Sequence, residues 1–124
     1  MPRPILDEAQ IHPAVRAKVE GWEQGIVREV AAAVQANDVV VVGMAMNPFP
    51  KKARAALDAI SQAYKYLEYG SYFALWRPRS ALKMWTGWPT FPMVFVKGVL
   101  VGGFSELRSL IESGELKRML AAAR

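Results

Sequence analysis

The sequence predicts an α/β fold in which one mixed, four-stranded sheet is flanked by helices and preceded by an N-terminal helical extension. The run Val39–Val42 consists of four β-branched apolar residues, a pattern typical of a strand buried on both faces of a sheet. Two further apolar runs, 92–96 and 99–101, are joined by Lys97-Gly98, and this spacing predicts an antiparallel hairpin. A segment with helical periodicity connects the first strand to the second, which predicts a parallel pair, whereas the hairpin strands are antiparallel. The expected sheet is therefore mixed.

Residues 1–37 are expected to form the helical extension, and residues 38–124 the main domain. The stretch 1–12 is expected to be irregular because it holds two prolines, whereas Pro13 suits the first turn of a helix. A second helix is expected over 23–36. The apolar face of each helix is formed by Val15, Val19 and Trp22 in the first and by Ile26, Val27, Val30, Ala31 and Val34 in the second.

The central segment predicts a strand, a helix and a second strand. A loop over 43–50 follows the valine run, and apolar residues at helical spacing then predict a helix from about 50 to 61. The residues with this spacing are Ala53, Ala56, Leu57 and Ile60. A second strand is expected over 64–69, where Gly70-Ser71 ends it, and it should run parallel to the first strand.

The C-terminal third predicts a short helix over 80–85, the hairpin, and two last helices. Gly102-Gly103 separates the hairpin from the first of these, and Ser113-Gly114 marks the break before the final one, which ends near Leu120. From residue 39 onward the order is therefore β-α-β-α-β-β-α. This order is that of the thioredoxin-like fold.

Composition and charge narrow the function classes. The net charge is +5, but the basic residues are dispersed, so we expect no nucleic-acid partner. The beginning of the chain lacks the apolar run of a secretory signal, and no apolar run approaches membrane-spanning length. We therefore expect a cytoplasmic protein that does not bind a membrane.

The chain contains no cysteine and one histidine. The absence of cysteine excludes a disulfide, a thiolate metal site and a cysteine nucleophile within these residues. The histidine, His12, precedes Pro13, where a capping role is expected rather than a metal or catalytic one. No metal site is predicted.

Three motifs together resemble the glutaredoxin family over about residues 38–120. Asn47-Pro48-Phe49-Pro50 stands at the strand-to-helix turn where dithiol members have Cys-Pro-Tyr-Cys, and Trp88-Pro89-Thr90-Phe91-Pro92 matches a segment of monothiol members. The third motif is Val101-Gly102-Gly103, followed by Ser113-Gly114-Glu115-Leu116. The resemblance implies that Pro92 is the family's cis-proline.

The resemblance also implies that this chain has lost the family's redox chemistry. The first cysteine position is Asn47, a good helix N-cap that is no nucleophile, and the second is Pro50. We therefore expect no catalytic residue and no thiol–disulfide exchange by the protein alone.

The same resemblance implies a glutathione groove with some of its charged residues changed. Phe91 would pair its backbone with the cysteinyl part of glutathione, and Arg79 would bind the glycine carboxylate. Gly103 and Phe104 would donate to the γ-glutamyl carboxylate, while Ser105 stands where the family has an aspartate. The family's lysine at the end of the first strand is replaced near residues 43–44. Glutathione is thus a possible ligand, with binding weakened by each lost charge.

Two function hypotheses follow. The preferred one is a non-catalytic module that binds a protein segment, or weakly glutathione, in the groove beside Pro92. The alternative is a role in glutathione-dependent redox or iron–sulfur cluster metabolism, with activity lost or dependent on a partner thiol. Some side chains are open to two interpretations. An anion patch or a solvated helix face would account for Lys51, Lys52 and Arg54, and a partner surface or packing for the aromatic residues from Tyr72 to Trp76. We expect Trp85 and Trp88 to be packing residues rather than stacking platforms for bases.

Overall fold

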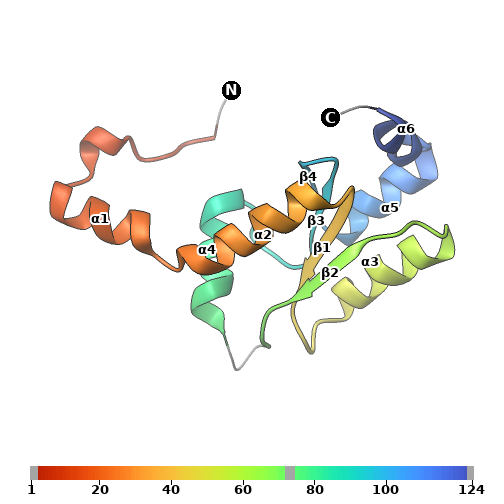
Figure 1. Ribbon diagram of the computed structural model, residues 1–124, viewed down its shortest axis with the longest axis horizontal. Coiled ribbons are helices and arrows are strands. Elements are labelled where there is room, and N and C mark those ends of the chain that lie inside the picture. Colours follow the sequence, from red (N-terminus) through yellow and green to blue (C-terminus); the bar gives the residue numbers. More distant parts are fainter. Residues whose placement is uncertain (1–2, 72–74, 123–124) are drawn as a thin grey trace.

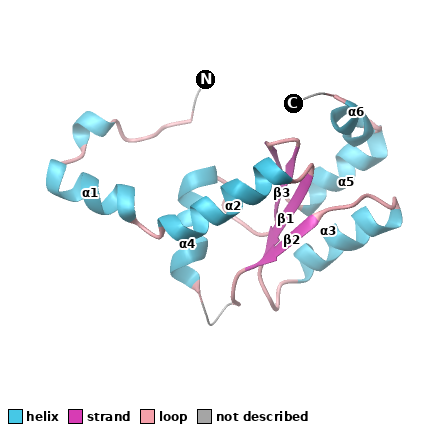
Figure 2. Ribbon diagram, viewed as in Figure 1, coloured by secondary structure: helices cyan, strands magenta, loops and turns pink. Residues whose placement is uncertain are grey.

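The computed structural model describes residues 3–71 and 75–122, and its elements alternate as the sequence predicts. They are a short 3-10 helix η1 (Glu8–Gln10), α1 (Pro13–Gly21), α2 (Gln24–Ala36), β1 (Val39–Gly43), α3 (Pro48–Ala59), β2 (Lys65–Glu68), α4 (Trp76–Thr86), β3 (Met93–Val96), β4 (Val99–Gly102), α5 (Phe104–Ser113) and α6 (Glu115–Ala121). The thioredoxin-like α/β fold is confirmed, with helices on both sides of one sheet (Figure 1, Figure 2).

The sheet has the strand order β2-β1-β3-β4 and is mixed. β1 runs parallel to β2 and antiparallel to β3, and β3 pairs with β4 as the predicted hairpin. Lys97 and Gly98 at the hairpin turn have φ angles of 51° and 82°. Positive φ at both central residues is what a tight two-residue hairpin turn requires, because it matches the twist of the two strands.

β1 is buried on both faces and divides the core into two layers. Val40 and Val42 face the layer formed by α2 and α4, whereas Val39 and Val41 face the layer formed by α3, α5 and α6. This alternation explains why all of β1 is apolar: each successive side chain enters a different half of the core.

Two helices begin earlier than the sequence predicts. α3 begins at Pro48, inside the expected loop 43–50, because Asn47 caps it and proline is tolerated at the first helical position. α4 begins at Trp76 rather than at residue 80. Pro78 is its third residue, and proline is tolerated there because the first N–H groups of a helix have no intrahelical partner to lose.

The N-terminal region consists of a projecting arm and a packed helix. α1 has no buried residue and extends away from the rest of the molecule (Figure 1). The stretch 1–12, expected to be irregular, includes η1. α2, in contrast, buries Val27, Val30 and Val34 against the sheet. Among the helices that the structure describes, none combines the length and the hydropathy needed to cross a bilayer.

Candidate functional site

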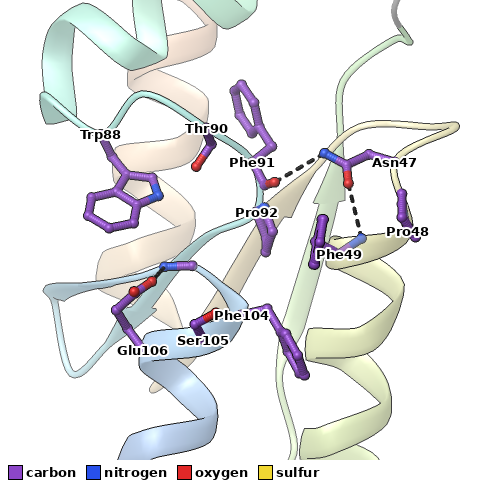
Figure 3. Close-up of a pocket in the computed structure, with 11 residues that line it drawn as sticks. Asn47, Pro48, Phe49, Trp88, Thr90, Phe91, Pro92, Phe104, Ser105 and Glu106 are labelled. Atoms are coloured by element: carbon purple, nitrogen blue, oxygen red, sulfur yellow. Dashed lines mark hydrogen bonds between the residues drawn. The ribbon is translucent and has the colours of Figure 1, made fainter.

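A cavity of about 470 Å³ lies where the first turns of α3 and α5 meet the loop between α4 and β3. Three segments line it: Asn47, Pro48 and Phe49; Trp88, Thr90, Phe91 and Pro92; and Gly103, Phe104, Ser105 and Glu106 (Figure 3). Six of the seven residues singled out in the sequence are brought together here. Their role as ligand contacts is a prediction that their placement does not test.

Asn47 occupies the position where the resemblance places a catalytic thiol, and its side-chain amide is already bonded on both sides. The Oδ1 atom accepts the Phe49 N–H at 3.0 Å, which caps α3, and Nδ2 donates to the Phe91 carbonyl oxygen at 3.1 Å (Figure 3). One side chain therefore joins the start of α3 to the loop before β3. An amide in this geometry holds the cavity wall in place and has no chemistry for a redox step.

The wall beside Asn47 is formed by Phe91 and Pro92, and the peptide bond between them is cis, as predicted. Both residues are buried, and the Phe91 side chain is 5% exposed. The Phe91 carbonyl has one partner, Asn47, and retains a second lone pair. The Phe91 N–H has no hydrogen-bond partner within the part of the chain that the structure describes.

The third wall is the beginning of α5, and it contains a residue that the sequence analysis missed. Glu106 folds back so that its Oε1 accepts the Gly103 N–H at 2.8 Å. This contact is half of a capping box, and the local signal for it was an acidic residue three positions after the helix N-cap. Glu106 is the one ionisable residue among those lining the cavity, and it directly follows Ser105. A carboxylate is thus present one residue after Ser105, the position where the family has an aspartate.

Each phenylalanine of the cavity carries a cation over its ring. The pairs are Lys52 over Phe49 at 4.9 Å from the ring centroid, Arg108 over Phe104 at 5.5 Å, and Lys83 over Phe91 at 5.8 Å. Phe49 and Phe104 themselves approach to 6.5 Å between centroids. The cavity wall is therefore partly aromatic, and a cationic side chain lies over each of these rings.

Arg79 does not line this cavity. It lies in α4, is 7% exposed, and donates from Nη1 to the Tyr69 carbonyl oxygen at 3.2 Å. Its guanidinium connects the end of the β2 segment to α4. Sequence spacing could not reveal this, because the direction of the side chain depends on how α4 packs.

A second, smaller cluster supports the loop that bears Asn47 from behind. The Arg54 guanidinium stacks 4.0 Å from the centroid of the Tyr66 ring, and the Tyr66 hydroxyl donates to Glu68 at 2.9 Å. Burial, together with the hydrogen bond to Glu68 and its negative charge, raises the pKa of Tyr66 to about 12, with Arg54 opposing the shift. Tyr66 therefore stays protonated and keeps donating at physiological pH. Of the proposed basic patch, Arg54 thus packs on Tyr66 and Lys52 packs on Phe49.

The remaining aromatic residues divide between packing and exposure. The Trp85 ring lies 6.2 Å from the Phe95 ring, as a packing residue would, but Trp85 is 42% exposed. Trp76 is 63% exposed at the start of α4. Tyr72 and Phe73, which the sequence offered as part of a partner surface, lie outside the described residues.

Comparison with known proteins identifies the relatives of this chain, although no family model matches it. It is 42% identical over 98 residues to a glutaredoxin-like protein of Dictyostelium discoideum, covering 79% of this chain and 80% of that protein. The structure of oxidized glutaredoxin 2 from Chlamydomonas reinhardtii is similar at a TM-score of 0.68 and 27% identity, over 79% of this chain and 92% of that one. A buckwheat glutaredoxin solved as a glutathione complex shares the fold at a TM-score of 0.69 and 22% identity, over 82% of this chain and 92% of that one. The length and identity of the Dictyostelium match, on a fold with the expected cavity, show that the chain belongs to the glutaredoxin family.

Proposed function

We propose that this protein is a non-catalytic binding module that holds an acidic, extended peptide in the cavity beside Pro92, glutathione being the smallest ligand of this kind. The observation that carries the proposal is the state of Asn47. Its amide occupies the position of the family's catalytic thiol and is held there by two hydrogen bonds. The cavity between the N-termini of α3 and α5 stays open. The binding surface is therefore retained without the nucleophile.

The chemistry of the chain excludes a redox step within these residues. Thiol–disulfide exchange proceeds through a mixed disulfide, which requires a protein thiolate, and the sequence has no cysteine. A ligand thiol that enters the cavity meets the Asn47 side chain, which can form no covalent bond to sulfur. Glutathione would accordingly bind and leave unchanged.

The backbone of Phe91 provides the means to bind an extended segment. Its N–H is without a partner among the described residues, and its carbonyl can accept a second bond. An extended peptide that aligns with this residue gains main-chain hydrogen bonds, as strands do when they add to a sheet. Side chains then contribute selectivity through the aromatic wall.

Charge favours an acidic ligand over a basic one. Lys52 and Arg108 lie over Phe49 and Phe104, two rings that line the cavity, and the whole chain has a net charge of +5. Such a field attracts anions and accelerates their association. The buckwheat relative, whose structure contains glutathione, supports an anionic tripeptide as the first ligand to test.

Calorimetric titration with S-methylglutathione tests this proposal. The probe keeps the peptide backbone and both carboxylates but has no free thiol, so it reports binding alone. We expect weak, saturable binding that weakens further as the salt concentration rises.

A pair of glycine variants provides the matched control. Gly103→Ala places a methyl group in the cavity, 3.4 Å from the nearest atom, and should weaken binding, whereas Gly21→Ala meets nothing within 4 Å and should not. No saturable heat with the wild-type protein, or equal affinities for the two variants, would overturn the proposal.

A further inference from the structure

A second cavity, of about 500 Å³, lies at the other end of β3 from Pro92. It is lined by residues from the C-terminal half of α2, the last turn of α4 and the hairpin that joins β3 to β4 (Figure 1). It shares no lining residue with the cavity beside Pro92. A cavity of this volume accommodates a small organic molecule, and the proposed function makes no use of it.

The interior of this second cavity is apolar and partly aromatic. Phe95 and Val34, both buried, form its base, and the indole of Trp85 forms a wall. The Trp85 and Phe95 rings lie 6.2 Å apart between centroids, with 31° between their planes, yet Trp85 remains 42% exposed. Packing on Phe95 therefore uses only part of the indole. A planar apolar ring that enters the cavity would contact the rest of it.

A single cation indicates which polar group the ligand would carry. Lys97 is the one ionisable residue among the described residues that line this cavity, and its side chain is 22% exposed. Its Nζ lies 3.4 Å from Asp38 Oδ1, which is longer than a good charge-assisted hydrogen bond, and the Asp38 side chain is 60% exposed. An ammonium group has three donors, and an ion pair with so exposed a carboxylate contributes little free energy. Lys97 can therefore bind a second carboxylate.

We propose that this second cavity, which we call the Trp85 cavity, binds a small aromatic carboxylate, with its ring against Trp85 and Phe95 and its carboxylate on Lys97 Nζ. The apolar interior selects the ring. Lys97 selects the anion over a neutral analogue of the same shape, and the net charge of +5 favours the same sign of ligand.

Two probes of the same shape, 2-naphthoate and the uncharged 2-naphthamide, test the proposal. The indole N–H signals of the four tryptophans are followed by ¹H–¹⁵N NMR while each probe is added. We expect 2-naphthoate to shift the Trp85 signal saturably, while the Trp76 signal, from the exposed start of the same helix, stays in place. 2-Naphthamide should bind roughly two- to fivefold more weakly, the factor that one partly exposed ion pair supplies.

Four variants separate the contribution of the ring from that of the charge. Trp85→Leu should abolish binding of both probes, whereas its control Trp76→Leu should leave binding unchanged, and the pair also assigns the two signals. Lys97→Asn removes the cation but keeps the fold, because Asn followed by Gly suits a hairpin turn with positive φ at both residues. It should lower the affinity for 2-naphthoate to that for 2-naphthamide. Asp38→Asn removes the competing carboxylate and should tighten 2-naphthoate binding alone.

Two results would overturn the proposal. A Trp85 signal that moves no more than the Trp76 signal would show that no ring binds in the Trp85 cavity. Equal affinities of the wild-type protein for the two probes, or undiminished 2-naphthoate binding by Lys97→Asn, would show that Lys97 does not bind the carboxylate. Neither result depends on whether S-methylglutathione binds beside Pro92, because the two cavities are lined by different residues.

Discussion

Asn47 shows how a single side chain can replace a reactive group with a structural one. Its oxygen caps α3 and its nitrogen bonds to the Phe91 carbonyl, so the amide satisfies two backbone groups that belong to different segments. Polar groups at a helix N-terminus are stabilised by the free N–H groups and by the helix dipole. The position has therefore kept the electrostatic surroundings that would favour a thiolate.

Reinstalling a thiol should reveal these surroundings. We expect Asn47→Cys to have a thiol pKa below the ordinary value of about 8.5, because the α3 N-terminus favours the anion. Pro50 supplies no N–H to that anion, so Pro50→Ala added to the first variant should lower the pKa further. The measurement is the rate of alkylation as a function of pH.

Ser109→Cys is the matched control for the thiol measurement. It places an exposed cysteine within α5, away from either helix N-terminus, and should titrate near the ordinary value. Only Asn47→Cys should form an adduct with oxidised glutathione at a measurable rate. Equal pKa values for the two cysteines would mean that the site has lost its electrostatic character as well as its thiol.

At the scale of elements, the contact between β1 and α3 fixes the cavity, and Gly43 makes that contact possible. A Cβ at Gly43 would lie 2.7 Å from Pro50 Cβ and 2.8 Å from the Tyr66 hydroxyl. These distances are too short for non-bonded atoms. Gly43 therefore allows the end of β1 to approach the first turn of α3, and the resulting position of α3 brings Asn47 to Phe91.

Gly43→Ala should consequently destabilise the protein by about 1–3 kcal/mol, the usual cost of an extra methyl group in a tightly packed site. Gly25→Ala is its control, since nothing lies within 4 Å of the added methyl group and the residue is helical. That variant should be at least as stable as the wild type. Urea denaturation measures the free energy of unfolding of both variants. Equal stability of the two variants would show that β1 and α3 are less tightly packed than described.

The sequence predicts elements well where local patterns act alone and less well where packing decides. Four consecutive valines allowed β1 to be located, and Lys97-Gly98 located the hairpin. The predicted start of α4, residue 80, lies four residues after the observed one, although Pro78 falls in the first turn, where proline is tolerated. Arg79 lies outside the cavity for a different reason: the direction in which its side chain points follows from the tertiary packing of α4. Trp88 packs against the core, as the sequence predicts, and it also lines the cavity. Glu106 was missed although its capping pattern was visible in the sequence.

At the scale of the whole molecule, we propose that the folded domain begins at α2 rather than at residue 38. α2 contributes Val27, Val30 and Val34 to the core, whereas α1 buries nothing. An arm that buries no side chain adds little to stability, because hydrophobic stabilisation follows the apolar area removed from water.

Two truncations test this boundary. A chain that begins at Trp22 should unfold cooperatively, with a free energy of unfolding close to that of the full chain. A chain that begins at Asp38 loses three buried valines, about 5 kcal/mol of burial, which is comparable with the whole stability of a small domain. It should show no cooperative transition. Thermal unfolding followed by circular dichroism distinguishes the two truncated chains. A cooperative transition in the chain that begins at Asp38 would place the domain boundary at residue 38.

The central claim, that the cavity beside Pro92 binds a ligand without a thiol, is tested most directly by mapping where S-methylglutathione binds. Backbone ¹H–¹⁵N spectra recorded during a titration report each residue separately. We expect saturable shifts in three segments, 47–49, 88–91 and 103–106, which line the cavity from different parts of the chain. Unchanged spectra, or shifts confined to a distant surface such as the groove between Ile60 and Leu116, would contradict the claim.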